Sequence, residues 1–159
     1  MKIIFLHLQI LLFSINVIFS QPSPPKISEP FNDGEKLEYR VHYGIFNASY
    51  ASLSLSKKDS LDDENLLASG YGKTIGLARL FFKVEDYYSS YFNTDKVDPI
   101  FFKRNIYEGG YTKNLEVSFD SEGNKASVNN IKKGTLEVIP TEENVQDLIS
   151  SLYLSLIHI

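Results

Sequence analysis

The chain has 159 residues, no cysteine and a formal net charge of −4 at pH 7. An acidic chain lacks the basic surface that nucleic acids require, and a chain without cysteine carries neither disulfides nor a lipid-modified cysteine. Of the three histidines, His7 lies in the apolar N-terminal run and His158 at the C-terminal end, which leaves His42. Multi-histidine metal sites and most histidine-based catalytic pairs are thereby disfavoured.

The N-terminal segment predicts a cleavable signal peptide. Lys2 provides a basic start, and residues 3–18 form a nearly continuous apolar run. Ser20 supplies a small residue for cleavage, which gives a signal at residues 1–20 and a Pro-rich leader at 21–33. A retained membrane anchor is the alternative, but the run is short for a bilayer and no basic cluster follows it. We therefore expect a periplasmic protein with no stable transmembrane segment after cleavage.

The last six residues, LSLIHI, reverse-translate to CTG TCT CTT ATA CAC ATC, which resembles the transposase adapter of sequencing libraries. We interpret residues 154–159 as adapter read-through, and residues 34–153 as a domain truncated at its C-terminal side. An ordinary apolar helix end is the alternative.

From residue 34 onward, period-two alternation predicts a series of strands. Leu37, Tyr39, Val41 and Tyr43 alternate with charged or polar residues, which predicts a strand whose aromatic and aliphatic side faces inward. Equivalent patterns predict strands at 37–43, 50–56, 66–75, 84–92, 100–107, 111–120, 126–129 and 135–139. Turn residues between them favour an antiparallel meander. The segment GLARLFF, residues 76–82, fits either a short helix or the start of a strand.

A helix is predicted after the last strand. Thr141 is expected to cap it, with Glu142 and Glu143 in its first turn, where carboxylates interact favourably with the helix dipole. One apolar stripe follows, formed by Val145, Leu148, Ile149 and Leu152.

Four blocks of sequence carry a family resemblance: GEKLEYRVHYGIFNASYASL, GLARLFFKVEDYYSSYF, NIYEGGYT and NVQDLISSLYL. Together they resemble the DUF3108 family of uncharacterised exported proteins, especially its Bacteroidota members, from Gly34 to Tyr153. The resemblance implies a mainly β fold, a curved antiparallel meander sheet or half-barrel of lipocalin-like or lipoprotein-carrier-like character, with one C-terminal helix. In the family, more strands follow that helix. The resemblance brings no established activity, substrate or catalytic residue.

Aromatic residues in the middle of the chain are the candidate binding site. A curved sheet can enclose an apolar ligand, and such a ladder could line its concave face. An ordinary packed core is the alternative. The candidate ligand-binding residues are Tyr87, Tyr88, Tyr91, Phe102, Arg104, Tyr107 and Tyr111.

Charged clusters offer weaker candidates. Glu85 and Asp86 with Lys83 and Arg104 suggest a polar cluster, but adjacent strand residues point to opposite faces, so a shared proton is not expected. Two sets of oxygen-bearing side chains superficially resemble calcium ligands: Asp120, Glu122 and Asn124 of the DSEGN segment, and Asp59, Asp62 and Asp63 of the 57–65 connection. Both lack calcium-loop spacing, so they indicate a turn and a solvated loop. No metal, cofactor or catalytic set is expected.

These observations favour a non-enzymatic periplasmic binding or carrier module for an apolar or lipid-like ligand. The alternative is a structural or interaction protein of the bacterial cell envelope with envelope protein partners. An enzyme would become the better interpretation if Asp86, Arg104 and Glu108 shared a pocket with strongly shifted pKa values. No nucleic-acid partner is expected.

Overall fold

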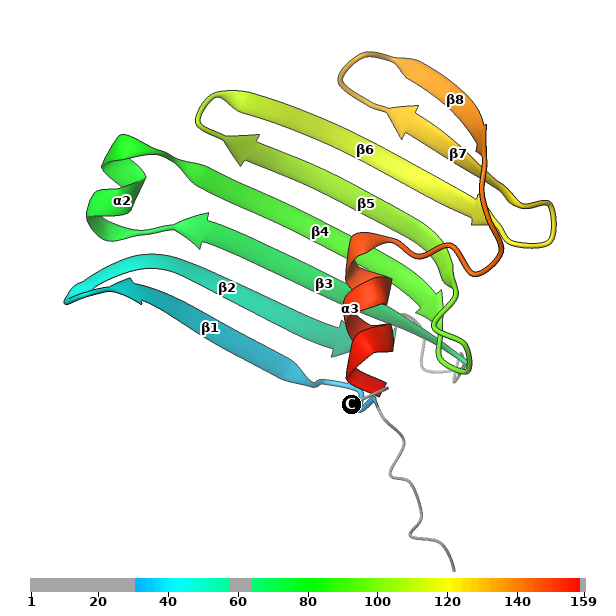
Figure 1. Ribbon diagram of the computed structural model, residues 1–159, viewed down its shortest axis with the longest axis horizontal. Helices are drawn as coiled ribbons and strands as arrows, with labels where there is room; N and C mark the ends of the chain where they lie inside the picture. Colours follow the sequence, from blue (N-terminus) through cyan, green and yellow to red (C-terminus); the bar gives the residue numbers. More distant parts are fainter. Residues whose placement is uncertain (1–30, 58–63, 158–159) are drawn as a thin grey trace, which may run out of the picture. The chain divides into compact units, whose positions relative to one another are not determined.

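The computed structural model describes residues 31–57 and 64–157 (Figure 1). The predicted signal peptide, most of the predicted leader, and Asp59, Asp62 and Asp63 lie outside these residues. Within the described part, eight strands form one antiparallel sheet. They are β1 (Lys36–Tyr43), β2 (Phe46–Ser56), β3 (Asn65–Thr74), β4 (Val84–Asn93), β5 (Pro99–Glu108), β6 (Tyr111–Asp120), β7 (Lys125–Asn130) and β8 (Thr135–Pro140).

The strands follow one another across the sheet in chain order, from β1 at one edge to β8 at the other. This confirms the predicted mainly β fold, an antiparallel meander with one helix near its C-terminal end. The sheet is not closed, because β1 and β8 do not pair with each other.

Among the residues that the structure describes, two helices accompany the sheet. The short helix α2 (Gly76–Phe81) links β3 to β4 and resolves the ambiguity of the GLARLFF segment. The helix α3 (Leu148–Ile157) lies against one face of the sheet over β3 and β4 (Figure 1). No helix within residues 31–57 and 64–157 has the length and hydropathy needed to cross a membrane.

The helix α3 covers part of one face of the sheet (Figure 1). We call the side covered by α3 the helix face and the opposite side the far face. On β4, the helix face carries Asp86, Tyr88, Ser90 and Phe92, and the far face carries Glu85, Tyr87, Ser89 and Tyr91. The buried apolar core on the helix face consists of Phe31, Leu55, Leu66, Ala68, Phe92, Val97, Phe102, Ile149 and Tyr153.

Phe31 extends the domain beyond its predicted start. Its ring makes edge contacts with Phe92, at a centroid distance of 6.0 Å, and with Tyr153, at 5.6 Å. The sequence placed Phe31 in a surface leader because the surrounding prolines interrupt any apolar period. The packed domain therefore begins at or before residue 31, not at Gly34.

The predicted helix start is wrong. Backbone N–H groups of Ile149 and Ser150 donate to the Asp147 carboxylate at 2.7 and 2.9 Å, and the Asp147 N–H donates to the Ser150 hydroxyl at 2.9 Å. This reciprocal cap starts α3 at Leu148. Thr141 instead donates its backbone N–H to the Asn124 carbonyl, and Asn144 has a φ of 58°, which an α-helix does not allow.

The later start also rotates the apolar stripe. Ile149 and Tyr153 are buried, whereas Leu148 and Leu152 are exposed and Val145 precedes the helix. Glu142 and Glu143 are exposed and likewise precede it.

Candidate functional site

The predicted aromatic site divides between the two faces of the sheet. Directly paired residues of neighbouring strands share a face, and Tyr88 pairs with Arg104 while Tyr87 pairs with Asn105. The helix face therefore carries Tyr88, Phe102, Arg104 and Tyr111, and the far face carries Tyr87, Tyr91 and Tyr107. The prediction of one aromatic surface is wrong, because consecutive tyrosines in a strand alternate.

On the helix face, three of the predicted residues come together at the edge of the core. Phe102 is buried in the core, and the Tyr88 ring lies tilted against it at a centroid distance of 6.4 Å. The Arg104 guanidinium lies 5.8 Å from the centre of the Tyr88 ring, a cation–π contact. Tyr111 lies farther along β6, opposite Glu108. Phe102 is thus part of the core, while Tyr88 and Arg104 lie at its border.

The cover that α3 provides ends between two glycines of β3. A Cβ added at Gly70 would lie 3.2 Å from Cδ1 of Ile149, whereas nothing lies within 4 Å of a Cβ added at Gly72. Gly72 belongs to a row of paired residues that crosses five strands on the helix face. This row, called the Gly72 row, comprises Tyr39, Ala51, Gly72, Asp86 and Ile106.

The β1 end of the Gly72 row is exposed and apolar. Tyr39 is half exposed, and so is Val41, which lies on the same face of β1. The sequence predicted that both would face inward. They do lie on the helix face, but both stay half exposed, although Tyr39 is close enough to Tyr153 of α3 to contribute to the raised pKa of its hydroxyl. Together with the small residues Ala51 and Gly72, they leave an apolar, uncovered strip of sheet.

Directly beside Gly72, on β4, lies a charged group. Asp86 is buried and accepts a hydrogen bond from the Tyr107 backbone N–H at 3.2 Å. Burial raises the pKa of Asp86, the nearby Glu108 raises it further, and the Tyr107 N–H and Arg104 oppose the rise. The structure therefore brings Asp86, Arg104 and Glu108 together. Within the described residues, Nε of Arg104 is buried and has no hydrogen-bond partner.

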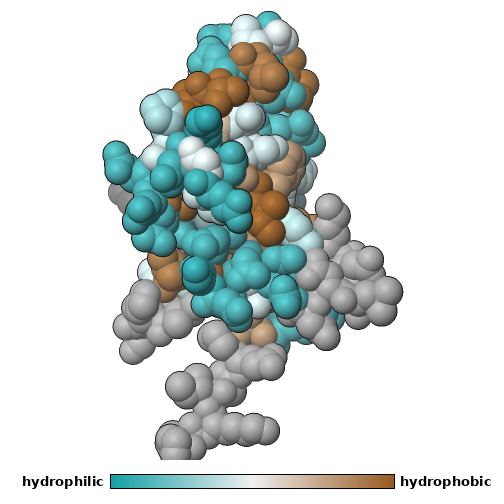
Figure 2. Space-filling model, turned by 90° about the vertical axis from the view of Figure 1, so that its right-hand side faces the viewer, coloured by the Kyte–Doolittle hydropathy of each residue, from teal (hydrophilic) through white to brown (hydrophobic). Residues whose placement is uncertain are grey.

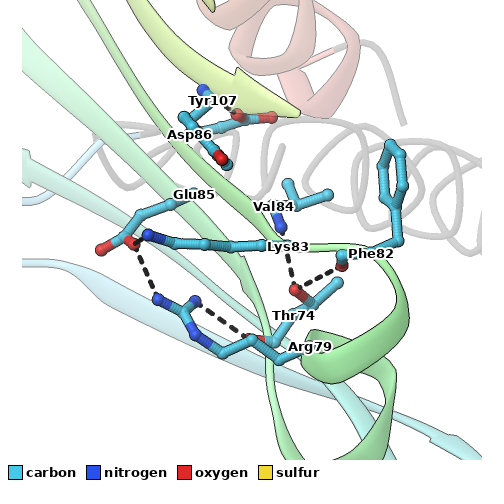
Figure 3. A network of polar contacts seen from close by, with 8 residues as sticks. All are labelled: Thr74, Arg79, Phe82, Lys83, Val84, Glu85, Asp86 and Tyr107. Atoms are coloured by element: carbon cyan, nitrogen blue, oxygen red, sulfur yellow. Dashed lines mark hydrogen bonds and ion pairs between the residues drawn. The ribbon is translucent and has the colours of Figure 1, made fainter. Parts of the chain in front are cut away.

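Glu85 lies on the far face in a different environment. Its carboxylate accepts a hydrogen bond from Arg79 at 3.0 Å and lies 3.7 Å from the Lys83 ammonium (Figure 3). These contacts lower the pKa of Glu85, and the hydrogen bond from Arg79 contributes most. Glu85 and Asp86 thus have opposite pKa shifts, and their opposite orientations agree with the prediction that they do not share a proton.

The far face carries a shallow groove lined by serine and tyrosine residues. One hollow of about 310 Å³ is lined by Ser52, Ser54, Ser69, Gly70, Tyr71, Tyr87, Tyr88, Ser89, Lys103 and Asn105. The Tyr71 and Tyr87 rings stack at 4.6 Å, and the Lys103 ammonium pairs with Glu116 at 2.9 Å. A second hollow of about 270 Å³ adjoins it around Tyr87, Asn105 and Tyr107. Hydroxyl and amide groups lie among tyrosine rings here, and most of the exposed lining of both hollows is apolar.

A third hollow, of about 350 Å³, lies at the β6–β7 turn. Its lining includes Asp120, Glu122 and Asn124, which the sequence assigned to a turn. The Asp120 carboxylate accepts the Gly123 backbone N–H at 2.9 Å, so it stabilises that turn. No group of three or more potential metal ligands comes together within the described residues.

Comparison with protein families gives one match. The family model described as "Protein of unknown function (DUF3108)" matches residues 38–157. The chain belongs to the DUF3108 family. No significant match was found among curated proteins or solved structures.

The matched region of this DUF3108 domain includes the whole Gly72 row and α3. Sequence reasoning identified Tyr88 and Arg104 but missed Tyr39, Ala51 and Gly72. Their small size gives no signal, since the same two strands hold further small residues such as Ala48, Ala68 and Gly70. That they lie side by side depends on strand register, which the sequence did not show.

Proposed function

We propose that this DUF3108 protein is an exported, non-enzymatic binding or carrier module of the periplasm that holds a lipid-like ligand on its helix face. The observation that carries the proposal is the open space at Gly72, bordered by the half-exposed Tyr39 on one side and by Arg104 and Tyr88 on the other. The predicted signal peptide supports the location.

An apolar chain would gain most from the β1 side of this strip. Tyr39 and Val41 expose apolar surface that a bound ligand would remove from water. Burial of apolar surface stabilises a complex by about 25 cal/mol per Å². Ala51 and Gly72 project little, so a slender group such as an acyl chain can lie along the sheet between the larger side chains. A broad, rigid ligand would meet Tyr88 and Ile149 at the border of the core.

The polar end of the ligand is expected to be an uncharged acceptor. The guanidinium of the partly exposed Arg104, which lies against Tyr88 at the border of this strip, can donate a hydrogen bond to such an acceptor. Asp86 and Glu108 lie beside it, so a carboxylate or phosphate would be repelled by two acidic groups. An ester or amide carbonyl accepts the same hydrogen bond without that repulsion. We therefore favour an acyl ester or acyl amide over a free fatty acid.

The proposal is tested by filling the open space at Gly72 with a side chain. Gly72→Leu places a side chain where nothing now lies within 4 Å, and a larger residue in a strand interior should not harm folding. Ser69→Leu adds the same side chain to the far face of the same strand and serves as the matched control. Both variants are checked for an unchanged thermal transition.

Binding is measured with a fluorescent acyl ester, and co-purifying lipids are measured by native mass spectrometry. We expect Gly72→Leu to weaken binding at least tenfold and Ser69→Leu to bind like the parent protein. Failure of the parent protein to bind, or equal binding by all three proteins, would contradict the proposal.

The exposed β8 edge favours a second candidate, an interaction protein of the cell envelope. Leu136, Val138 and Ile139 are all exposed on this edge strand, and edge strands with exposed apolar residues pair readily with other chains. Crosslinking in envelope extracts would capture a partner through β8. Substituting Val138→Lys would abolish that capture without affecting ligand binding at Gly72.

A further inference from the structure

Large apolar side chains project from one end of the sheet. Ile45, Leu80 and Phe81 are 90%, 81% and 88% exposed, values that are unusual for residues of this size. Three neighbouring residues, Phe46, Leu77 and Phe82, are also at least half exposed. The six residues, called the apolar tip, are Ile45, Phe46, Leu77, Leu80, Phe81 and Phe82.

The apolar tip combines two segments that lie next to each other. The β1–β2 turn and α2 occupy the same end of the sheet (Figure 1). The Ile75 backbone N–H donates to the Ala48 carbonyl at 2.9 Å, and a Cβ added at Gly76 would lie 3.0 Å from the Asn47 carbonyl. Figure 2 views the opposite end, where hydrophilic side chains lie beside hydrophobic patches. The three most exposed large apolar side chains of the described residues, those of Ile45, Phe81 and Leu80, all belong to the apolar tip.

Polar contacts at its base hold the apolar tip in place. The Thr74 hydroxyl donates to the Phe82 carbonyl at 3.0 Å and accepts the Val84 N–H at 2.9 Å (Figure 3). Arg79 joins α2 to the sheet through the Thr74 carbonyl and the Glu85 carboxylate. None of the residues of α2 is buried. A helix of six residues has little stability alone, so these contacts, rather than apolar burial, fix it.

The surroundings of the tip match a lipid interface. Three cations, those of Arg79, Lys83 and Lys73, all act on the carboxylate of Glu85 at the base of the tip. Tyr107 lies nearby, with the Lys83 ammonium 4.9 Å from its ring centre. Tyrosines and long cationic side chains behind an apolar edge are typical of proteins at the headgroup level of a bilayer.

We propose that the apolar tip is a membrane-docking surface that inserts into the interface of a bilayer containing anionic lipids. Its separately projecting side chains suit a fluid apolar phase, which needs no complementary shape. The proposal goes beyond ligand binding at Gly72 and does not depend on it.

The chain contains no tryptophan, so a single introduced tryptophan reports on one position. Phe81→Trp places the probe in the apolar tip, and Leu136→Trp places it on β8, where the parent side chain is 70% exposed. Each variant is mixed with vesicles of phosphatidylcholine with or without phosphatidylglycerol. Insertion is read from a blue shift of emission and from quenching by brominated lipid chains.

We expect the Phe81→Trp probe to shift and to be quenched on vesicles containing phosphatidylglycerol, less so at high salt, while the Leu136→Trp probe stays in water. Adding Leu80→Ser to Phe81→Trp should weaken the vesicle titration by about tenfold, because a large apolar side chain is lost from the inserted surface. Leu136→Ser in the same Phe81→Trp background is the matched control and should leave the titration unchanged.

An unshifted Phe81→Trp probe, or equal responses from both tryptophan positions, would overturn the proposal. A blue shift that depends on protein concentration without vesicles would also overturn it, by showing that a second copy covers the tip. Loss of ligand binding in Gly72→Leu leaves these outcomes unaffected, so the two proposals fail separately.

Discussion

The hydroxyl of Ser90 donates a 2.6 Å hydrogen bond to the carboxylate of Asp147, and this buried contact ties the start of α3 to the middle of β4. The other oxygen of the same carboxylate accepts the N–H groups of Ile149 and Ser150. One side chain therefore both starts the helix and positions it on the sheet. Cover of the core up to Gly70 depends on that position.

Asp147→Ala is expected to destabilise the fold by about 2–4 kcal/mol, because the helix loses its cap and Ser90 is left buried without its acceptor. Thr141→Ala should change stability by less than about 0.5 kcal/mol, because its side chain caps no helix. Urea unfolding of both variants measures the difference. A larger loss of stability in Thr141→Ala would instead support a helix capped by Thr141, as the sequence predicts.

Gly70 and Gly72 are expected to respond in opposite ways to the same substitution. Gly70→Val forces Ile149 and Leu53 apart and should cost about 1–3 kcal/mol of unfolding free energy. Gly72→Val meets open space, and a β-branched residue favours a strand, so stability should stay the same or rise. Chemical denaturation of the pair is the measurement. Equal destabilisation would mean that α3 extends farther along β3.

Tyr153 should make stability sensitive to alkaline pH. Burial raises the pKa of its hydroxyl to about 12, while the unfolded chain titrates near 10. The folded state therefore keeps its proton longer, so stability is complete below about pH 10 and falls as pH rises toward 12, by about 2 kcal/mol. Tyr153→Phe should remove this loss. Urea unfolding midpoints of both proteins, measured between pH 9 and 12, test this prediction. Parallel pH dependences for the parent protein and Tyr153→Phe would contradict the assignment of the loss to Tyr153.

The adjacent carboxyls offer a paired test of strand orientation. The pKa of Asp86 is raised, so its ionised form is disfavoured in the fold, and Asp86→Asn should increase stability at pH 7 by less than about 1 kcal/mol. The pKa of Glu85 is lowered by Arg79, so Glu85→Gln should decrease stability at pH 7. Both differences should fade as the pH falls below about 4. Thermal melts from pH 3 to 7 measure them, and effects of the same sign would be inconsistent with opposite faces.

Much of the sheet could be predicted because alternation reports directly on strands. The strand expected at 100–107 is found at Pro99–Glu108, and the one expected at 111–120 is found with those same bounds. The helix start could not be read as easily, since Thr141 with two following glutamates and Asp147 with Ser150 both resemble caps. Two structural features decide between them: the positive φ of Asn144 and the hydrogen bond that the Ser90 hydroxyl donates to the Asp147 carboxylate.

The candidate site was harder to predict than the strands. Alternation already separates Tyr87 from Tyr88, but which of them lies beside an uncovered strip depends on where α3 stops. The apolar tip was missed for a different reason. Residues 76–82 have no clear period, and nothing in their composition shows that Phe81 would remain exposed when Phe92 is buried.

The order of the strands also bears on how the chain folds. Each strand pairs with the one made just before it, so every hairpin closes a short loop at small entropic cost. The contact between Ser90 and Asp147 instead spans 57 residues. Folding should therefore proceed hairpin by hairpin from either edge, with docking of the C-terminal helix as the late step that locks the core.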